Sequence, residues 1–182
     1  MIKLIFILIA SVCFSAVFSQ DDDIASIRKI YQSTNELIAV SKTQEGGGLY
    51  SNEITVNSNN GSWRAVGNYS KKSVFWYSDD PAQYVQVNEN STESGALVKA
   101  EISSEAAASM KFYTEYLFDN DQLIFIYKVE DAYEGKIEYR YYLKDEQVIR
   151  YMINQETSAG LPDSEDLIKE ANEIKRIFLS TF

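Results

Sequence analysis

The chain has 182 residues, of which 45% are hydrophobic and 13% aromatic, and its formal net charge is −10 at pH 7. This length provides for one domain with a real hydrophobic core. The chain contains no histidine and only one cysteine, Cys13. These counts exclude the serine and cysteine catalytic triads, the common zinc sites and a histidine proton shuttle. The acidity argues against nucleic acids and anionic membrane surfaces as partners.

The first residues are typical of a secretory signal peptide. Lys3 is followed by a short apolar run, and small residues surround Ser19, as a cleavage site requires. We therefore predict a signal peptide at residues 1–19, a single α+β domain at residues 20–182, and a protein that is periplasmic or secreted. Removal of Lys3 changes the formal charge from −10 to −11.

Two other interpretations of the leader remain open. The apolar run is shorter than the ~20 residues that a membrane-spanning helix needs, so a membrane anchor is less favoured. Acylation of Cys13 would make the chain a lipoprotein, but Val12 is a poor neighbour for that signal. Cleavage leaves a mature chain without cysteine, held together by packing alone and with no stable insertion in a membrane.

An amphipathic helix is expected after the leader. Its apolar stripe has helical spacing over about four to five turns and contains Ile24, Ile27, Ile30, Tyr31, Leu37 and Ile38. The run 21–23 of aspartates is expected to cap the start of this helix. Calcium binding by this run is less favoured, because consecutive residues do not converge on one ion without a loop. The glycines 46–48 then link the helix to a sheet.

Short runs of β-branched and aromatic residues predict strands in the middle of the chain. They lie at residues 49–56, 63–69, 73–77 and 97–102, with a shorter strand at 84–87. Polar turn residues separate the runs. Short connections make neighbouring strands antiparallel.

Two similar segments follow and organise the predicted sheet. Residues 115–126 align with residues 140–151. Each copy has an aromatic-rich run, a polar turn and a second apolar run, which together predict a β-hairpin.

The hairpin pairing predicts which side chains share a face of the sheet. One face is expected to be almost uncharged and to contact the helices, while the other is partly wet. The expected cross-strand pairs are Phe118–Leu123, Leu143–Val148 and Lys128–Glu138. With strict alternation, the apolar face also carries Tyr116, Phe125, Tyr141 and Arg150.

A second amphipathic helix is expected near the end of the chain. It follows Gly160 and Pro162, and Asp163 or Ser164 is expected to cap it. Its apolar positions are Leu167, Ile168, Ala171, Ile174, Ile177 and Phe178. The predicted fold class is α+β, with a single curled antiparallel meander sheet of about 7–8 strands packed by an N-terminal and a C-terminal amphipathic helix.

The main candidate for ligand binding is a basic residue among aromatic residues. Arg150 is expected beside Tyr116, Phe125 and Tyr141 on the apolar face. There it forms either a structural cation–π contact, which is the favoured interpretation, or a contact with a carboxylate or sulfate of a ligand. The tyrosines and the two tryptophans also permit sugar stacking, although cross-strand packing is the more common role of such residues.

Carboxylate chemistry is compatible with the composition. Glycoside hydrolysis needs two acids at a suitable separation, and Glu115 and Glu138 fall on one predicted face. Each has a nearer basic partner in the predicted register, Arg140 for Glu115 and Lys128 for Glu138. Ordinary ion pairs are therefore favoured over a catalytic pair, and no catalytic residue, metal ligand or cofactor is predicted.

The tandem resembles a motif in uncharacterised exported β-meander proteins of Bacteroidota. In that motif Tyr-Tyr-Phe, a turn and Leu-Ile-Phe recur, and the matching residues here are 115–127 and, more weakly, 140–151. Asp121 and Glu146 stand where that motif has a turn glycine. The resemblance implies export and a meander sheet, and it implies no activity.

Three functions are compatible with these features. The first is an exported, non-enzymatic binding or structural module for a small ligand, a glycan or a protein, with a filled core and an exposed aromatic patch. The second is a periplasmic carrier of a lipid-like ligand, which requires an apolar cavity of ligand size. The third is a carboxylate-dependent glycan hydrolase, which requires two acids with raised proton affinity in one cleft.

Overall fold

The computed structural model of the chain describes residues 2–44, 47–64, 67–78, 97–106, 110–133 and 135–182, with the backbone alone for residues 2–19. The strands form one antiparallel sheet in the order β1-β3-β4-β5-β6-β7-β8-β9, and β2 pairs with β3. The predicted α+β meander is confirmed. The described elements are α1 (Ile2–Thr43), β1 (Tyr50–Val56), β2 (Ser62–Trp63), β3 (Gly67–Tyr77), β4 (Leu97–Ala106), β5 (Met110–Asp119), β6 (Gln122–Ala132), β7 (Gly135–Lys144), β8 (Gln147–Ile153), β9 (Glu156–Thr157) and α2 (Glu165–Leu179).

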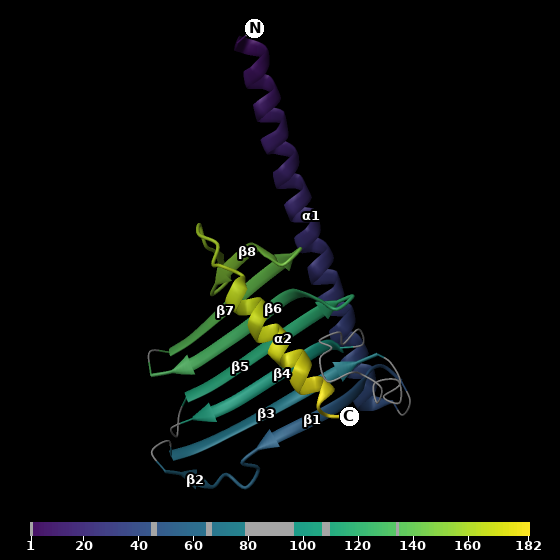
Figure 1. Cartoon of the computed structure of the whole chain (residues 1–182), viewed down its shortest axis with the longest axis vertical. Coiled ribbons are helices and arrows are strands. Elements are labelled where there is room, and N and C mark those ends of the chain that lie inside the picture. Colours follow the sequence, from purple (N-terminus) through teal and green to yellow (C-terminus); the bar gives the residue numbers. More distant parts are fainter. Residues whose placement is uncertain (1, 45–46, 65–66, 79–96, 107–109, 134) are drawn as a thin grey trace.

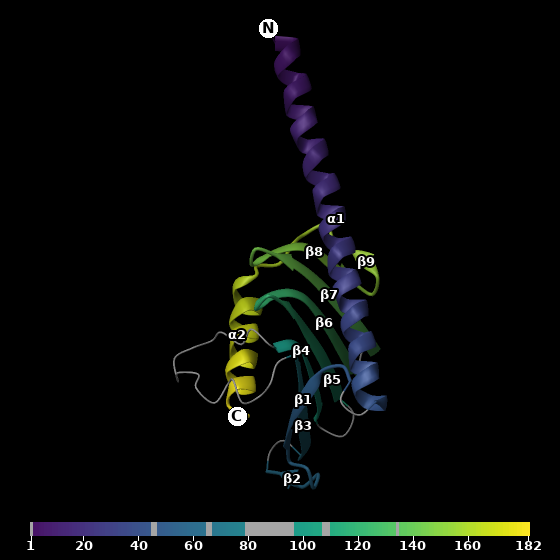
Figure 2. The ribbon, with the colours of Figure 1, turned by 90° about the vertical axis from the view of Figure 1, so that its right-hand side faces the viewer.

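The two helices lie on opposite faces of the sheet. α2 crosses one face diagonally, and the C-terminal half of α1 lies against the other face (Figure 1). Seen from the side, the sheet curves around α2, while the N-terminal half of α1 extends beyond the sheet (Figure 2). The sheet is open, because the order of its described strands ends at β1 and at β9. The predicted curled sheet flanked by two helices is confirmed. The expectation that one apolar face contacts both helices is wrong, because α2 packs on one face and α1 on the other.

The face that α2 covers contains the larger hydrophobic core. The apolar stripe of α2 packs on aromatic and aliphatic side chains of five neighbouring strands, because one face of an amphipathic helix must be buried. The buried side chains of this core include Phe75, Tyr77, Ala100, Tyr116, Phe118, Ile126, Leu143, Leu167, Ile174 and Phe178. Ser164 precedes α2 without a side-chain capping bond, and Asp163 Oδ1 instead accepts a hydrogen bond from the Glu165 amide at 3.1 Å.

The face that α1 covers contains a smaller core. Its buried members are Ile24, Ile27, Leu117, Phe125 and Tyr142. The predicted apolar stripe of this helix is largely confirmed, except that the Leu37 side chain is 45% exposed.

α1 is longer than the sequence predicts, because it runs without a break through the predicted cleavage site after Ser19. The aspartates therefore lie within a helix rather than at its start, and the expected capping role is wrong for the full chain. Asp21 instead pairs with Arg150 at 2.5 Å, and Asp23 pairs with Lys144 at 2.8 Å. These two ion pairs hold α1 to β7 and β8. Within the described residues, no helix is both long and apolar enough to cross a membrane.

The strands before the tandem differ from the prediction. Residues 63–69 and 73–77 were expected as two strands, but β3 is continuous from Gly67 to Tyr77 and β2 has only two residues. Polar residues in the middle of β3, from Ser70 to Ser73, interrupt the apolar pattern without interrupting the backbone pairing with β1 and β4. The strand expected at residues 84–87 lies outside the described residues.

Both hairpins of the tandem contain a bulge at the same place. The expected pairs next to the two turns are confirmed. The next pair in the first hairpin is Leu117 with Phe125, so Ile124 is an extra residue. The second hairpin repeats this arrangement, with Ile149 as the extra residue. A bulge shifts the alternation of side chains beyond it, and it therefore changes which residues share a face.

The turns of the two hairpins also match. Asn120 and Asp121 have φ angles of 48° and 66°, and Asp145 and Glu146 have φ angles of 47° and 61°. Two-residue hairpin turns with positive φ at both positions match the right-handed twist of the flanking strands. Aspartate and asparagine tolerate this backbone conformation, and Glu146 adopts it as well. Both turns thus form without the glycine that the resemblance led us to expect.

Candidate functional site

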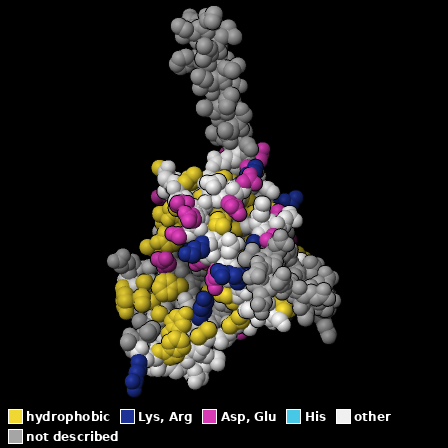
Figure 3. Space-filling model, in the orientation of Figure 1, with side chains coloured by type: hydrophobic (Ala, Val, Ile, Leu, Met, Phe, Trp, Pro, Cys, Tyr) yellow, Lys and Arg dark blue, Asp and Glu magenta, His cyan; other side chains and the backbone are white. Residues whose placement is uncertain are grey.

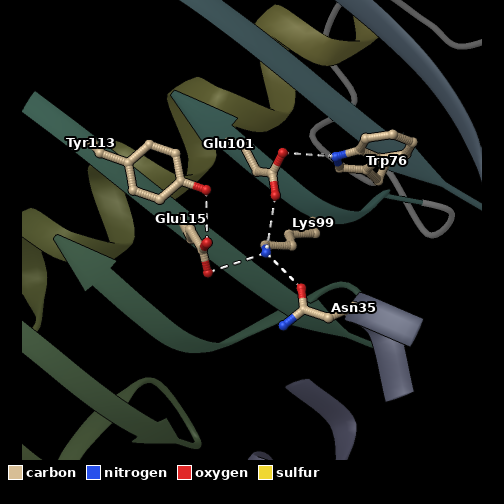
Figure 4. Close-up of polar contacts among 6 residues, drawn as sticks. All are labelled: Asn35, Trp76, Lys99, Glu101, Tyr113 and Glu115. Atoms are coloured by element: carbon tan, nitrogen blue, oxygen red, sulfur yellow. Dashed lines mark hydrogen bonds and ion pairs between the residues drawn. The ribbon is translucent and has the colours of Figure 1, made fainter. Parts of the chain in front are cut away.

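A buried lysine lies between α1 and the sheet at the centre of a polar network. Lys99 of β4 is 1% exposed. Its Nζ lies 3.1 Å from a carboxylate oxygen of Glu101 and 3.1 Å from one of Glu115, and it donates to Asn35 Oδ1 of α1 at 2.9 Å (Figure 4). One ammonium group thus bridges two carboxylates that face each other across β4 and β5.

Aromatic side chains complete this network. Tyr113 Oη donates to Glu115 at 2.7 Å, and Trp76 Nε1 donates to Glu101 at 3.2 Å (Figure 4). Burial, and then the hydrogen bond to Glu115, raises the pKa of both Tyr113 and Tyr31, so both phenols stay protonated and donate. The ion pairs and hydrogen bonds of this network therefore form a structural centre that holds α1 on the sheet.

An open pocket of about 290 Å³ lies beside this network, between α1 and the strands β6 and β7. It is lined by Ile27, Arg28 and Tyr31 from α1, Phe125 and Tyr127 from β6, and Arg140 and Tyr142 from β7. Tyr31 joins the two features, because its ring also lies 5.1 Å from Lys99 Nζ. The pocket thus combines aromatic walls with two arginines, although the formal net charge of the whole chain is −10.

Arg140 is the charged lining residue that the sheet contributes to the pocket. Its guanidinium lies 4.9 Å above the ring of Tyr127, and Nη2 pairs with Glu138 at 2.7 Å. Nη1 is buried and has no hydrogen-bond partner among the described residues. Leaving a buried donor unsatisfied costs about 1–3 kcal/mol, and other atoms of Arg140 line the pocket.

Arg28 is the charged lining residue that α1 contributes to the pocket. Its Nε donates to Tyr142 Oη at 3.3 Å, and its guanidinium lies 5.6 Å from the centre of that ring. The side chain is exposed, and within the described part of the chain it forms no ion pair. Each arginine of the pocket therefore stacks on a tyrosine, and the exposed Arg28 leaves N–H groups available.

Comparison with known proteins assigns this chain to no family. No family model, no curated protein and no solved structure matches it. The chemistry of the pocket therefore has to be inferred from its own residues.

The four ligand-binding candidates from the sequence do not share one face, contrary to the prediction. Tyr116 and Tyr141 lie on the face covered by α2, where both pack in or against the larger core. Phe125 and Arg150 lie on the α1 face. The bulges at Ile124 and Ile149 cause this separation, because they reverse the alternation between the turn and the rest of each hairpin.

Only Phe125 of these candidates lines the pocket. Arg150 binds Asp21 of α1, so it has the structural role that was favoured, although its contact is an ion pair. Arg28, Tyr31, Tyr127, Arg140 and Tyr142 were missed as site residues. A signal existed for the first two, since Tyr31 belongs to the predicted apolar stripe and Arg28 precedes it by three residues on the helix.

Glu115 and Glu138, the predicted acid pair, do share the α1 face. The basic residues that were expected to pair with them are wrong. Glu115 pairs with Lys99, and Glu138 pairs with Arg140 and with Lys136 at 2.8 Å. Lys128 instead pairs with Glu170 of α2. The register between β6 and β7 is one residue away from the expected one, which places Lys128 on the opposite face.

Hydrogen bonds from Lys136 and Arg140 hold the pKa of Glu138 at about 2, below its ordinary value of 4.5. A general acid needs the opposite shift. Among the described residues, no group of three or more acidic or cysteine side chains is placed to hold a metal ion.

Glu138 gives the fold a pH-dependent contribution. A lowered folded-state pKa stabilises the protein above the unfolded-state value of 4.5, and this stabilisation is lost as the pH falls toward about 2. We expect wild-type protein to have a higher urea midpoint than Glu138→Gln at pH 7. The difference should shrink below pH 4.5 and vanish near pH 2. A difference that is constant over this range would contradict the assignment.

Two other surfaces carry aromatic residues. On the α2 face, hydrophobic side chains gather at the lower left of Figure 3, over strand ends that α2 does not cover. Exposed Trp63 packs on Tyr69 with ring centres 5.4 Å apart. Also on this face, the rings of Tyr139 and Tyr151 are parallel, with centres 6.4 Å apart. Neither surface combines aromatic rings with an unsatisfied buried donor.

Proposed function

We propose that the chain is an exported, non-enzymatic module that binds a small ligand in the pocket between α1 and the sheet. The observation that carries this proposal is that two guanidinium groups, those of Arg28 and Arg140, lie among the aromatic walls of one open pocket. The exposed Arg28 side chain forms no ion pair within the described residues, so its N–H groups can donate to an acceptor on a ligand.

The composition of the pocket supports this proposal. Binding sites for small molecules combine apolar and aromatic walls with a few placed polar groups. Here Ile27 and Phe125 supply apolar surface, while arginine and tyrosine side chains supply the polar groups. The neighbouring Lys99 network fixes α1 against β4 and β5, so the walls of the pocket are held in place before a ligand binds.

A carrier of a lipid-like ligand is less well supported. Such a carrier needs a large apolar cavity between the sheet and a helix. On the α2 side, Phe178, Phe75 and Ala100 are each 0% exposed and fill the space between helix and sheet. On the α1 side, the pocket of about 290 Å³ is smaller than the cavity that a lipid carrier needs, and its walls contain two guanidinium groups.

A glycan hydrolase is also less well supported. The two carboxylates that face each other, Glu101 and Glu115, share Lys99. The lowered pKa of Glu138 makes it a poor proton donor at neutral pH. Binding without catalysis is the simpler use of these residues.

Export remains part of the proposal. It rests on the leader pattern at residues 1–19 and on the resemblance of the tandem to exported β-meander proteins of Bacteroidota. The absence of cysteine after residue 13 agrees with a domain that is stabilised by packing alone.

A fragment screen by two-dimensional NMR tests the proposed function. We expect neutral and charged single-ring fragments to include binders that shift the backbone amides of residues 27–31, 125–127 and 140–142. Amides of α2 itself, such as those of Leu167 and Ile174, serve as the internal control and should change little. The proposal is wrong if no fragment perturbs the pocket, or if the perturbed amides lie only on the α2 face.

A further inference from the structure

We propose that the ligand of this pocket is a small aromatic carboxylate: a single ring that carries one carboxylate group. This inference rests on the proposed function and specifies its ligand. It follows from three properties of the pocket, namely its size, its charge and the chemistry of its walls.

The size of the pocket sets the scale of the ligand. Its volume is about 290 Å³, whereas an engineered apolar cavity of about 150 Å³ accepts one benzene molecule. The pocket therefore accommodates a single ring with a short polar substituent. A sugar chain or an acyl chain would extend well beyond it.

The charge of the pocket favours an anion. Its two charged lining residues, Arg28 and Arg140, are both cationic. Glu138 neutralises only part of this charge, because it is shared between Arg140 and Lys136. A guanidinium group that presents free N–H groups binds the oxygens of a carboxylate in a planar, charge-assisted geometry.

The walls favour an organic anion over an inorganic one. The side chain of Phe125 packs edge to face on Tyr31 at 5.3 Å and in a tilted arrangement on Tyr142 at 5.0 Å. These rings provide a surface on which another ring gains contact. A phosphate ion would exchange part of its hydration for these apolar walls, which is unfavourable. A ring places its apolar part against Ile27 and Phe125 while its carboxylate contacts the arginines.

Isothermal titration with three probes tests this inference on the full domain. Benzoate carries the ring and the charge, benzamide carries the ring without the charge, and inorganic phosphate carries charge without the ring. We expect benzoate to bind at least about tenfold more tightly than either of the others, which corresponds to one charge-assisted hydrogen bond.

Matched variants locate the contact. Arg140→Gln removes the guanidinium that the sheet contributes to the pocket and should weaken benzoate binding by about tenfold or more. Lys136→Gln is the control, because it removes one positive charge that also pairs with Glu138 but does not line the pocket. Its benzoate affinity should stay within about twofold to threefold of the wild type. Circular dichroism verifies that both variants fold.

The outcomes separate this inference from the proposed function. Benzamide binding as tightly as benzoate would overturn the carboxylate assignment and leave a small-molecule binding module in place. Phosphate binding as tightly as benzoate would overturn the assignment of an aromatic ligand. Equal losses in Arg140→Gln and Lys136→Gln would show that only net charge matters, which also overturns it. The fragment screen decides the proposed function independently of these probes.

Discussion

Replacing Lys99 with methionine is expected to lower the free energy of unfolding by about 3–5 kcal/mol, the cost of breaking a buried ion pair by removing one partner. Lys99 is 1% exposed and stands between the carboxylates of Glu101 and Glu115. Methionine fills a similar volume but carries no charge, so the buried Glu115 loses the ammonium group with which it pairs. Urea denaturation at pH 7 measures the loss.

Lys72→Met is the matched control for this prediction. Lys72 pairs with Glu53 at 2.7 Å, but the two side chains are 52% and 49% exposed. Exposed ion pairs contribute about 0–1 kcal/mol, so this variant should lose no more than that. Adding Glu115→Gln to Lys99→Met should recover part of the loss by removing the buried charge. A loss below about 1 kcal/mol in Lys99→Met would show that the network does not stabilise the fold.

Phe178→Ala is expected to destabilise the fold by about 3–5 kcal/mol, because it removes a large side chain from a packed core and leaves a cavity. Phe178 is 0% exposed in the last turn of α2. Its ring centre lies 5.8 Å from that of Phe75 and 5.3 Å from that of Tyr77. The urea midpoint and the thermal transition should both fall.

Leu161→Ala is the control for the α2 interface. Leu161 precedes α2 and is 57% exposed, so its truncation should change stability by no more than about 0.5 kcal/mol. Equal effects of Phe178→Ala and Leu161→Ala would mean that α2 is not packed on the sheet as described.

The fold was predictable because its signals are local. The tandem alignment of residues 115–126 and 140–151 identified both hairpins, and the spacing of Leu167, Ile174 and Phe178 identified α2. A two-residue side-chain period and a helical period are distinct patterns, so they separate strands from helices without knowledge of contacts.

The register beyond each turn was not predictable in the same way. A bulge of this kind needs no special residue, and Ile124 and Ile149 are ordinary strand residues. Once the extra residue is present, Phe125 and Arg150 move to the face opposite Tyr116 and Tyr141. A single inserted position in each hairpin thus divided a predicted cluster of four residues.

The pocket was not predictable because it depends on contacts between distant segments. Arg28 and Tyr31 reach it from α1, and Arg140 and Tyr142 reach it from β7. The position of α1 on the sheet is set by pairs such as Lys144 with Asp23, which are 121 residues apart. No local pattern encodes such a pairing. The sequence predicted that charged residues such as Glu115 and Glu138 lie on the α1 face. The basic residues with which they pair depend on the exact strand register.

Nuclear Overhauser effects between a bound single-ring fragment and the protein test the central claim most directly. With benzoate, or with the tightest binder from the fragment screen, we predict contacts from the ring protons to the side chains of Phe125 and Tyr142. Contacts only to Tyr139 and Tyr151 would instead place the ligand on the opposite face of the sheet, and they would contradict a binding site between α1 and the strands β6 and β7.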